Sequence, residues 1–178
     1  MPTWLSVLLE ILKITIPALI VFLTVYYLLK QYLEKQYQFR LLEFRQNQAK
    51  TTVPLRLQAY ERLSLFCERI AIPNLLLRLR AENQKAGALR VALLMAIQQE
   101  FEHNITQQVY VSEKLWEIIK IARNDALTII NGLAEKVDPQ ADAAEFANFL
   151  LNYVNSQETS TLEKALIAIK KEAGTLFA

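Results

Sequence analysis

The segment ITIPALIVFLTVYYLL, residues 14–29, carries no charged side chain and is followed at once by Lys30. As an α-helix it is about 24 Å long. Extension of the helix back to Trp4 makes it long enough for the ~30 Å hydrocarbon layer of a bilayer. The residue types that anchor a span at the two bilayer interfaces flank the segment: Trp4, Tyr26, Tyr27 and Lys30. The sequence therefore predicts one transmembrane anchor over residues 1–29.

Two other interpretations of this segment compete with the anchor. A cleaved signal peptide has a basic amino-terminal region and a small-residue cleavage site. Here the first charge is Glu10, and no such site follows Leu29. A buried core helix needs neighbours that surround an almost wholly apolar rod. We prefer the anchor to both.

The overall charge of +2 is distributed unevenly along the chain. Residues 30–50 contain five basic and two acidic side chains, whereas residues 51–178 contain 14 basic and 15 acidic ones. Basic residues that flank a span tend to stay on the cytoplasmic side. We therefore expect the amino terminus outside a bacterial inner membrane and the carboxyl-terminal domain in the cytoplasm. A near-neutral domain with no basic stripe disfavours nucleic-acid binding.

Residues 30–50 predict an amphipathic juxtamembrane helix. Large apolar side chains recur there at spacings of four and three, which places them on one helix face: Leu33, Tyr37, Leu41 and Phe44, with Leu29 before them. This face is a candidate surface for self-association or for a protein partner. Whether the helix is straight or folds back on the following domain stays open.

Residues 51–178 predict an antiparallel bundle of about five helices, and the whole chain is predicted to be all-α. The chain has only 3 Gly and 5 Pro, and no alternating strand pattern competes with the helical one. Helix starts are expected at Thr51-Thr52 before Pro54, at Ser112, at Asp138-Pro139, and at Ser160, where Glu163 completes a capping box. One expected core-facing stripe is Leu93, Leu94, Ile97, Phe101 and Ile105.

Three stretches of the predicted bundle carry a resemblance: LQAYERLSLFCERI (57–70), IPNLLLRL (72–79) and IQQEFEHNITQQVYVSEKLWEIIKIAR (97–123). The chain resembles an uncharacterised family of bacterial inner-membrane proteins with one amino-terminal span and a helical cytoplasmic domain. The similarity covers the anchor and most of the domain and is densest at residues 98–123. The resemblance implies the architecture and brings no activity, ligand or catalytic residue.

Glu100 and His103 form a Glu-x-x-His pair, the spacing used by carboxylate-bridged di-iron bundles. Such a site needs a second histidine, and His103 is the only one in the chain. On a helix His103 also points away from Phe101 and the core stripe. We therefore predict no metal site and no cofactor. The polar run is instead a solvated helix side or a docking surface for a partner: Glu100, His103, Asn104 and Gln107.

The sequence contains no catalytic constellation. Cys67 shares a face with apolar residues and is expected to be a buried small group instead of a nucleophile. There is no glycine-rich phosphate loop, no paired-cysteine motif and no Gly-x-Ser-x-Gly. We therefore predict a non-enzymatic, membrane-anchored interaction or scaffold module. Two alternatives stay open: an accessory subunit of a larger membrane complex, and an enzyme for a membrane-derived substrate that uses Glu100, His103 and Arg90.

Overall fold

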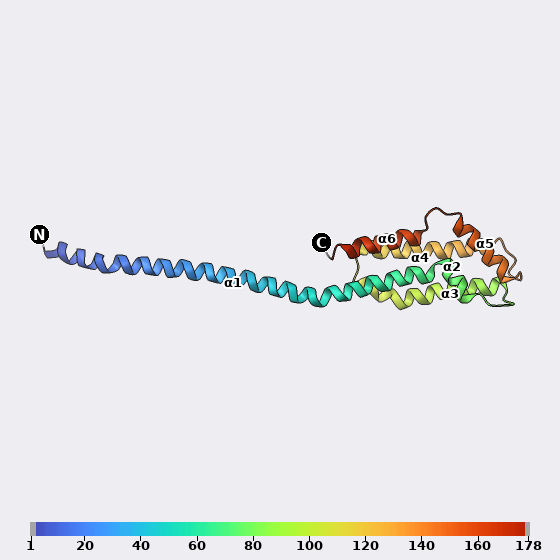
Figure 1. Cartoon of the computed structure of the whole chain (residues 1–178), viewed down its shortest axis with the longest axis horizontal. Helices are drawn as coiled ribbons and strands as arrows, with labels where there is room; N and C mark the ends of the chain where they lie inside the picture. The colour runs from blue at the N-terminus through green and yellow to red at the C-terminus, as the bar shows by residue number, and fades with distance from the viewer. Residues whose placement is uncertain (1–2, 177–178) are drawn as a thin grey trace. The chain divides into compact units, whose positions relative to one another are not determined.

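The computed structural model describes residues 3–176, and these residues are almost entirely helical (Figure 1). The α-helices and the single 3₁₀ helix η1 are, in chain order, α1 (Thr3–Ile70), α2 (Ile72–Leu79), α3 (Ala86–Asn104), η1 (Ile105–Val109), α4 (Glu113–Ala134), α5 (Ala143–Asn155) and α6 (Thr161–Gly174). Over the range 3–176 no strand forms, and the only extended pairing is an isolated bridge between Lys85 and Asp142. The all-α prediction is confirmed.

The chain divides into two compact units, Met1–Thr51 and Thr52–Ala178. From residue 3 on, the first unit consists of the first part of α1 alone. The second contains the remainder of α1 together with the helices α2 to α6. Only the second unit has a hydrophobic core, because a single helix has no neighbour of its own to pack against.

Two predicted helix starts are wrong. Thr51-Thr52 and Pro54 do not open a new helix but lie inside α1. The Thr51 hydroxyl donates to the carbonyl of Asn47 (3.4 Å), one turn back, so it does not cap a new amino terminus. Proline keeps a helical φ and forfeits a single backbone hydrogen bond, which α1 tolerates here.

The second error concerns Asp138 and Pro139, which lie in a turn instead of starting α5. The Asp138 carboxylate accepts from the backbone N–H of Gln140 (2.9 Å). The N-cap of α5 is Asp142, whose carboxylate accepts from the N–H of Ala144 (2.7 Å). The helix therefore begins four residues later than predicted.

The other predicted caps are confirmed. The Ser112 hydroxyl accepts from the N–H of Leu115 (3.1 Å) at the start of α4. At the start of α6, Ser160 and Glu163 form both halves of a capping box, each side chain accepting from the backbone N–H of the other (3.1 Å each). These local signals place the two helices at the correct residues.

The core of the second unit lies between the last part of α1 and the helices α2 to α6. Its largest side chains with less than 2% exposure include Phe66, Leu93, Ile119, Phe146 and Ile169. In Figure 1, α4 and α6 lie side by side, and α3 also packs against α4. The Phe101 ring lies between Phe66 (centroids 6.1 Å apart) and Trp116 (5.6 Å), and so joins α1, α3 and α4.

The predicted stripe of α3 is confirmed except at its end. Leu93 and Ile97 are fully buried, whereas Ile105 is 41% exposed. The reason is that α3 ends at Asn104 and the chain continues as the 3₁₀ helix η1. A 3₁₀ helix advances 120° per residue instead of 100°, so the face that points to the core changes at this junction.

Candidate functional site

No other element of the first unit packs against its apolar helix. Every side chain that the structure describes between Trp4 and Lys50 is exposed. Among the described residues, α1 is long and apolar enough to cross a membrane. The Thr15 hydroxyl donates to the carbonyl of Ile11 (2.9 Å) and the Thr24 hydroxyl to that of Ile20 (2.8 Å). The two hydroxyls therefore have partners inside the helix and need no water.

The residues predicted to flank or extend this segment are also exposed. Trp4, Tyr26 and Tyr27 are 63%, 59% and 68% exposed, and Lys30 is exposed as well. The predicted juxtamembrane face is exposed as well, at each of its four residues: Leu33, Tyr37, Leu41 and Phe44. No other element of the first unit covers them, so any partner must come from elsewhere.

The predicted polar face of α3 is not one exposed surface. Only His103 is fully open, whereas Asn104 and Gln107 are each 7% exposed. The Asn104 amide donates to the carbonyl of Glu100 (2.8 Å), which satisfies it within its own turn. The prediction that these four side chains lie together on a solvated face is therefore wrong. The change to η1 at residue 105 turns Gln107 inward.

Glu100, His103 and Arg90 do not meet in one place. The Glu100 carboxylate, largely buried, forms an ion pair with Arg69 of α1 (3.0 Å). The Arg90 guanidinium donates twice to the side-chain carbonyl of Asn131 on α4 (2.7 and 3.0 Å). Both charged groups thus contact neighbouring helices. The three side chains do not form one site.

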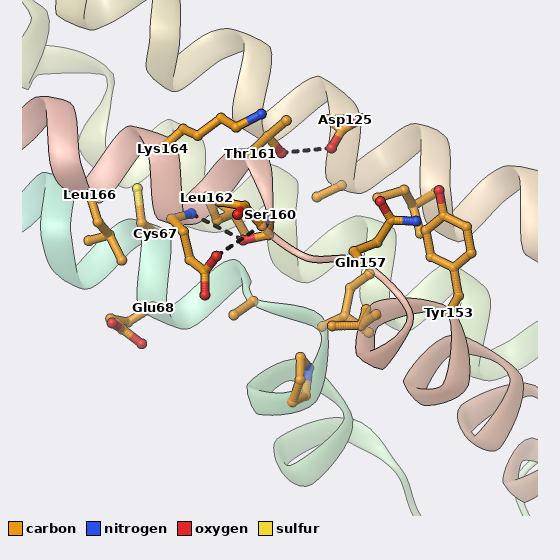
Figure 2. Close-up of a pocket in the computed structure, with 18 residues that line it drawn as sticks. Cys67, Glu68, Asp125, Tyr153, Gln157, Ser160, Thr161, Leu162, Lys164 and Leu166 are labelled. Atoms are coloured by element: carbon orange, nitrogen blue, oxygen red, sulfur yellow. Dashed lines mark hydrogen bonds between the residues drawn. The ribbon is translucent and has the colours of Figure 1, made fainter.

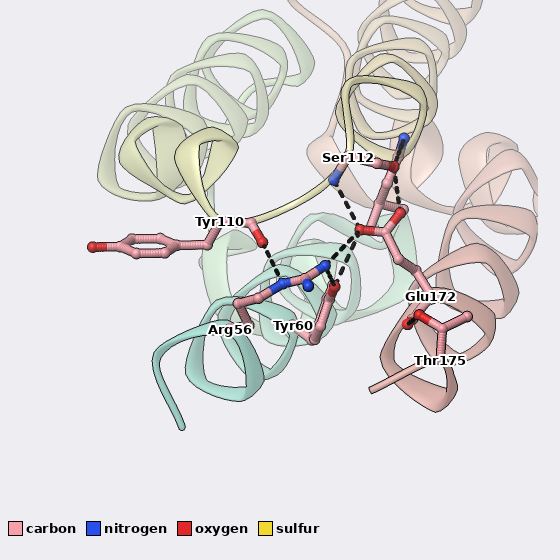
Figure 3. Close-up of polar contacts among 7 residues, drawn as sticks. Arg56, Tyr60, Tyr110, Ser112, Glu172 and Thr175 are labelled. Atoms are coloured by element: carbon pink, nitrogen blue, oxygen red, sulfur yellow. Dashed lines mark hydrogen bonds and ion pairs between the residues drawn. The ribbon is translucent and has the colours of Figure 1, made fainter. Parts of the chain in front are cut away.

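A polar cluster that the sequence did not indicate is centred on Glu172 of α6 (Figure 3). Its carboxylate accepts from the backbone N–H of Ser112 (2.8 Å), from the Ser112 hydroxyl, and from the Tyr60 hydroxyl (3.1 Å). Arg56 donates to the Tyr60 oxygen (2.8 Å) and to the carbonyl of Tyr110 (3.1 Å), with its guanidinium 4.0 Å from Glu172. We call Arg56, Tyr60, Ser112 and Glu172 the Glu172 cluster.

The Glu172 cluster holds three helices together. Its carboxylate lies at the amino terminus of α4, where unpaired N–H groups favour a negative charge. Burial raises the pKa of Tyr60 above its usual 10.0, and the negative charge of the nearby Glu172 carboxylate is the second cause of the increase. The phenol therefore stays protonated and donates to Glu172 at neutral pH. The stability that it contributes is complete below pH 10 and is lost as the pH rises further.

A cavity of about 490 Å³ opens between the α1–α2 junction and the start of α6 (Figure 2). Cys67, 1% exposed, forms part of its wall. Burial raises the pKa of the Cys67 thiol to about 12, so it is protonated at neutral pH and is a poor nucleophile. This agrees with the predicted buried role of Cys67. Within residues 3–176, no three His, Cys, Asp or Glu side chains are grouped as metal ligands.

Residues 6–176 match a family described as a family of unknown function (DUF7935). The chain belongs to this family. The match spans both units, the apolar helix and the bundle. The resemblance to an uncharacterised family is therefore confirmed at this level. Comparisons with curated proteins and with solved structures found no match.

In this DUF7935 chain, sequence reasoning missed the Glu172 cluster because its members are distant in sequence. Tyr60 and Glu172 are 112 residues apart. One signal was available, since Tyr60 lies two helical turns before Cys67, on the same helix face, and a buried tyrosine hydroxyl needs a partner. The sequence does not say which acceptor provides it.

Proposed function

We propose that this DUF7935 member is a single-span membrane protein that holds a helical interaction module at the cytoplasmic face of a bacterial inner membrane. The observation that supports the span is the exposed, uncharged segment 14–29, whose threonine hydroxyls are satisfied within the helix. Its ten Leu, Ile, Phe and Val side chains each favour insertion by about 0.3–0.6 kcal/mol, or roughly 3–6 kcal/mol together.

The orientation and the non-enzymatic role are supported by separate features. Five basic side chains within residues 30–50 favour the cytoplasm for the bundle. The charged groups of α3 that sequence reasoning offered for catalysis are engaged in contacts between helices. The face Leu33–Phe44 is exposed and apolar, and we propose that it provides contact with a second copy or with a protein partner.

Membrane fractionation tests the anchor. We expect the full chain to sediment with membranes, to resist high salt and alkaline carbonate, and to dissolve in nonionic detergent. A chain that lacks residues 1–29 should remain in the supernatant with its helical circular dichroism intact. A reporter fused after Ala178 that is active only outside the inner membrane should stay silent. Recovery of the full chain in the supernatant without detergent would refute the proposal.

A double substitution tests the juxtamembrane face. Leu33→Glu with Leu41→Glu should weaken association in membranes at least tenfold, because each leucine loses about 1.5 kcal/mol or more of apolar burial. Phe39→Glu with Leu42→Glu is the matched control, since both residues are exposed but lie off this face. The measurement is energy transfer between labelled copies and crosslinking to other proteins. Equal association in the two variants would exclude this face as the contact.

A further inference from the structure

Residues 51–54 of α1 combine several features that disfavour a helix. Thr51, Thr52 and Val53 are three consecutive β-branched residues, which lose side-chain freedom in a helix. Pro54 has no N–H to donate to the carbonyl of Lys50, and its ring crowds that carbonyl. A residue that precedes proline, here Val53, is also disfavoured in the helical conformation. Local chemistry therefore favours a break at this point, whereas the structure has an uninterrupted helix.

Burial of side chains does not compensate for this unfavourable chemistry. Thr51, Thr52 and Pro54 are exposed, and Val53 is only half-buried. Among the side chains of α1 that the structure describes, none before Ala59 is buried. In proteins most of the stability of a helix comes from the packing of one of its faces. Residues 51–54 therefore have neither the helix propensity nor the buried side chains that usually hold a helix together.

This weak stretch lies where α1 enters the bundle. The boundary between the two compact units falls directly after Thr51. On the bundle side, the Arg56 guanidinium donates to the carbonyl of Tyr110 (3.1 Å), ahead of α4, and so fixes α1 two residues after Pro54. On the other side, the Thr51 hydroxyl donates to the carbonyl of Asn47 (3.4 Å), a contact that tends to bend a helix. A break within residues 51–54 would therefore leave the contacts of the bundle intact.

We propose that residues 51–54 are a joint, at which α1 alternates between the continuous helix and a less populated form broken at Val53. In the broken form Val53 takes the extended conformation that a residue before proline prefers. The helix then restarts at Pro54, where the first turn has no acceptor for an N–H in any case. The break would allow the two units to change orientation relative to each other. This joint depends neither on the membrane span nor on the juxtamembrane face, and it would give the proposed interaction module a movable tether.

Hydrogen exchange of the full chain, in micelles of a nonionic detergent, tests the joint. In the broken form the amides of Leu55 and Arg56 lose their carbonyl acceptors one turn back, so they exchange through this form. Proline in the interior of a helix lowers helix stability roughly 100-fold relative to alanine. We therefore expect Pro54→Ala to raise the protection factors of these two amides at least tenfold. Unchanged protection factors would overturn the proposal.

A second proline provides the matched control. Pro73 lies in the first turn of α2, where its missing N–H does not interrupt a helix. We expect Pro73→Ala to leave the protection factors of Leu55 and Arg56 unchanged. A gain as large as that of Pro54→Ala would show that the effect is a general change in the stability of the bundle, and it would refute the joint.

Spin labels on the two sides of the joint report both forms directly. Arg40→Cys and Glu61→Cys provide exposed labelling sites, in a chain with Cys67→Ala and with unlabelled chain in excess. In an unbroken helix the Cα atoms of these two positions are about 32 Å apart. We expect double electron–electron resonance to show a second, shorter distance beside this one, and Pro54→Ala to remove it. A single distance shared by the chains with and without Pro54→Ala would overturn the proposal.

Discussion

Replacing Phe146 by alanine is expected to lower the free energy of unfolding of the bundle by about 3–5 kcal/mol. Phe146 lies in α5, is 0% exposed and is among the largest fully buried side chains. Its removal forfeits the transfer free energy of the ring and leaves a hole that the packed helices α2, α3 and α4 around α5 fill only in part.

The measurement is urea unfolding of the full chain in nanodiscs, followed by far-ultraviolet circular dichroism. Phe149→Ala is the matched control, because Phe149 lies one turn further along the same helix and is 39% exposed. We expect it to cost about 1 kcal/mol or less, in line with surface substitutions. Similar losses in the two variants would contradict the core that the structure places around α5.

Replacing Glu172 by alanine is expected to cost about 3 kcal/mol. The carboxylate accepts three hydrogen bonds, from the Ser112 N–H, the Ser112 hydroxyl and the Tyr60 hydroxyl. Hydrogen bonds to a charged group are worth about 1.5–3 kcal/mol each, although such bonds to a single group do not add up in full. The alanine variant also leaves the largely buried Tyr60 hydroxyl without its acceptor.

A double-mutant cycle separates the cluster from general helix effects. We compare the loss in free energy of unfolding in the double variant Glu172→Ala with Ser112→Ala against the sum of the two single losses. The double loss should be smaller than this sum by at least about 1 kcal/mol, because the two changes remove the same contacts. Glu61→Ala, an exposed glutamate-to-alanine change in α1, should cost less than about 0.5 kcal/mol. Strict additivity of the two single changes would show that Glu172 does not act through Ser112.

The sequence predicted those helix starts whose signal is local. Ser112, Ser160 and Glu163 make their capping contacts within three residues of themselves, so their side chains are sufficient to place the start. Asp138 and Asp142 are both good caps, and local chemistry does not choose between them. The choice depends on distant backbone contacts, since Ala86 N–H donates to Ala141 (2.9 Å) and Ala143 N–H donates to Gln84 (3.0 Å).

The candidate sites were less predictable than the fold for the same reason. The apolar segment 14–29 and the buried position of Cys67 follow from composition and periodicity. The polar run of α3 was misjudged, because a change from α to 3₁₀ geometry at Ile105 turned Gln107 inward. The cavity and the Glu172 cluster arise where helices from distant parts of the sequence meet, and a helical pattern does not specify which neighbours it will have.

The hydrogen bond between Tyr60 and Glu172 has a consequence for folding during translation. Those two partners emerge from the ribosome 112 residues apart. At about 5–20 residues per second, the interval lasts roughly 6–22 s. During that time the Tyr60 hydroxyl lacks the carboxylate that accepts from it, and the Glu172 cluster is incomplete. Newly made chains can therefore complete this contact between α1 and α6 only after α6 has been synthesised.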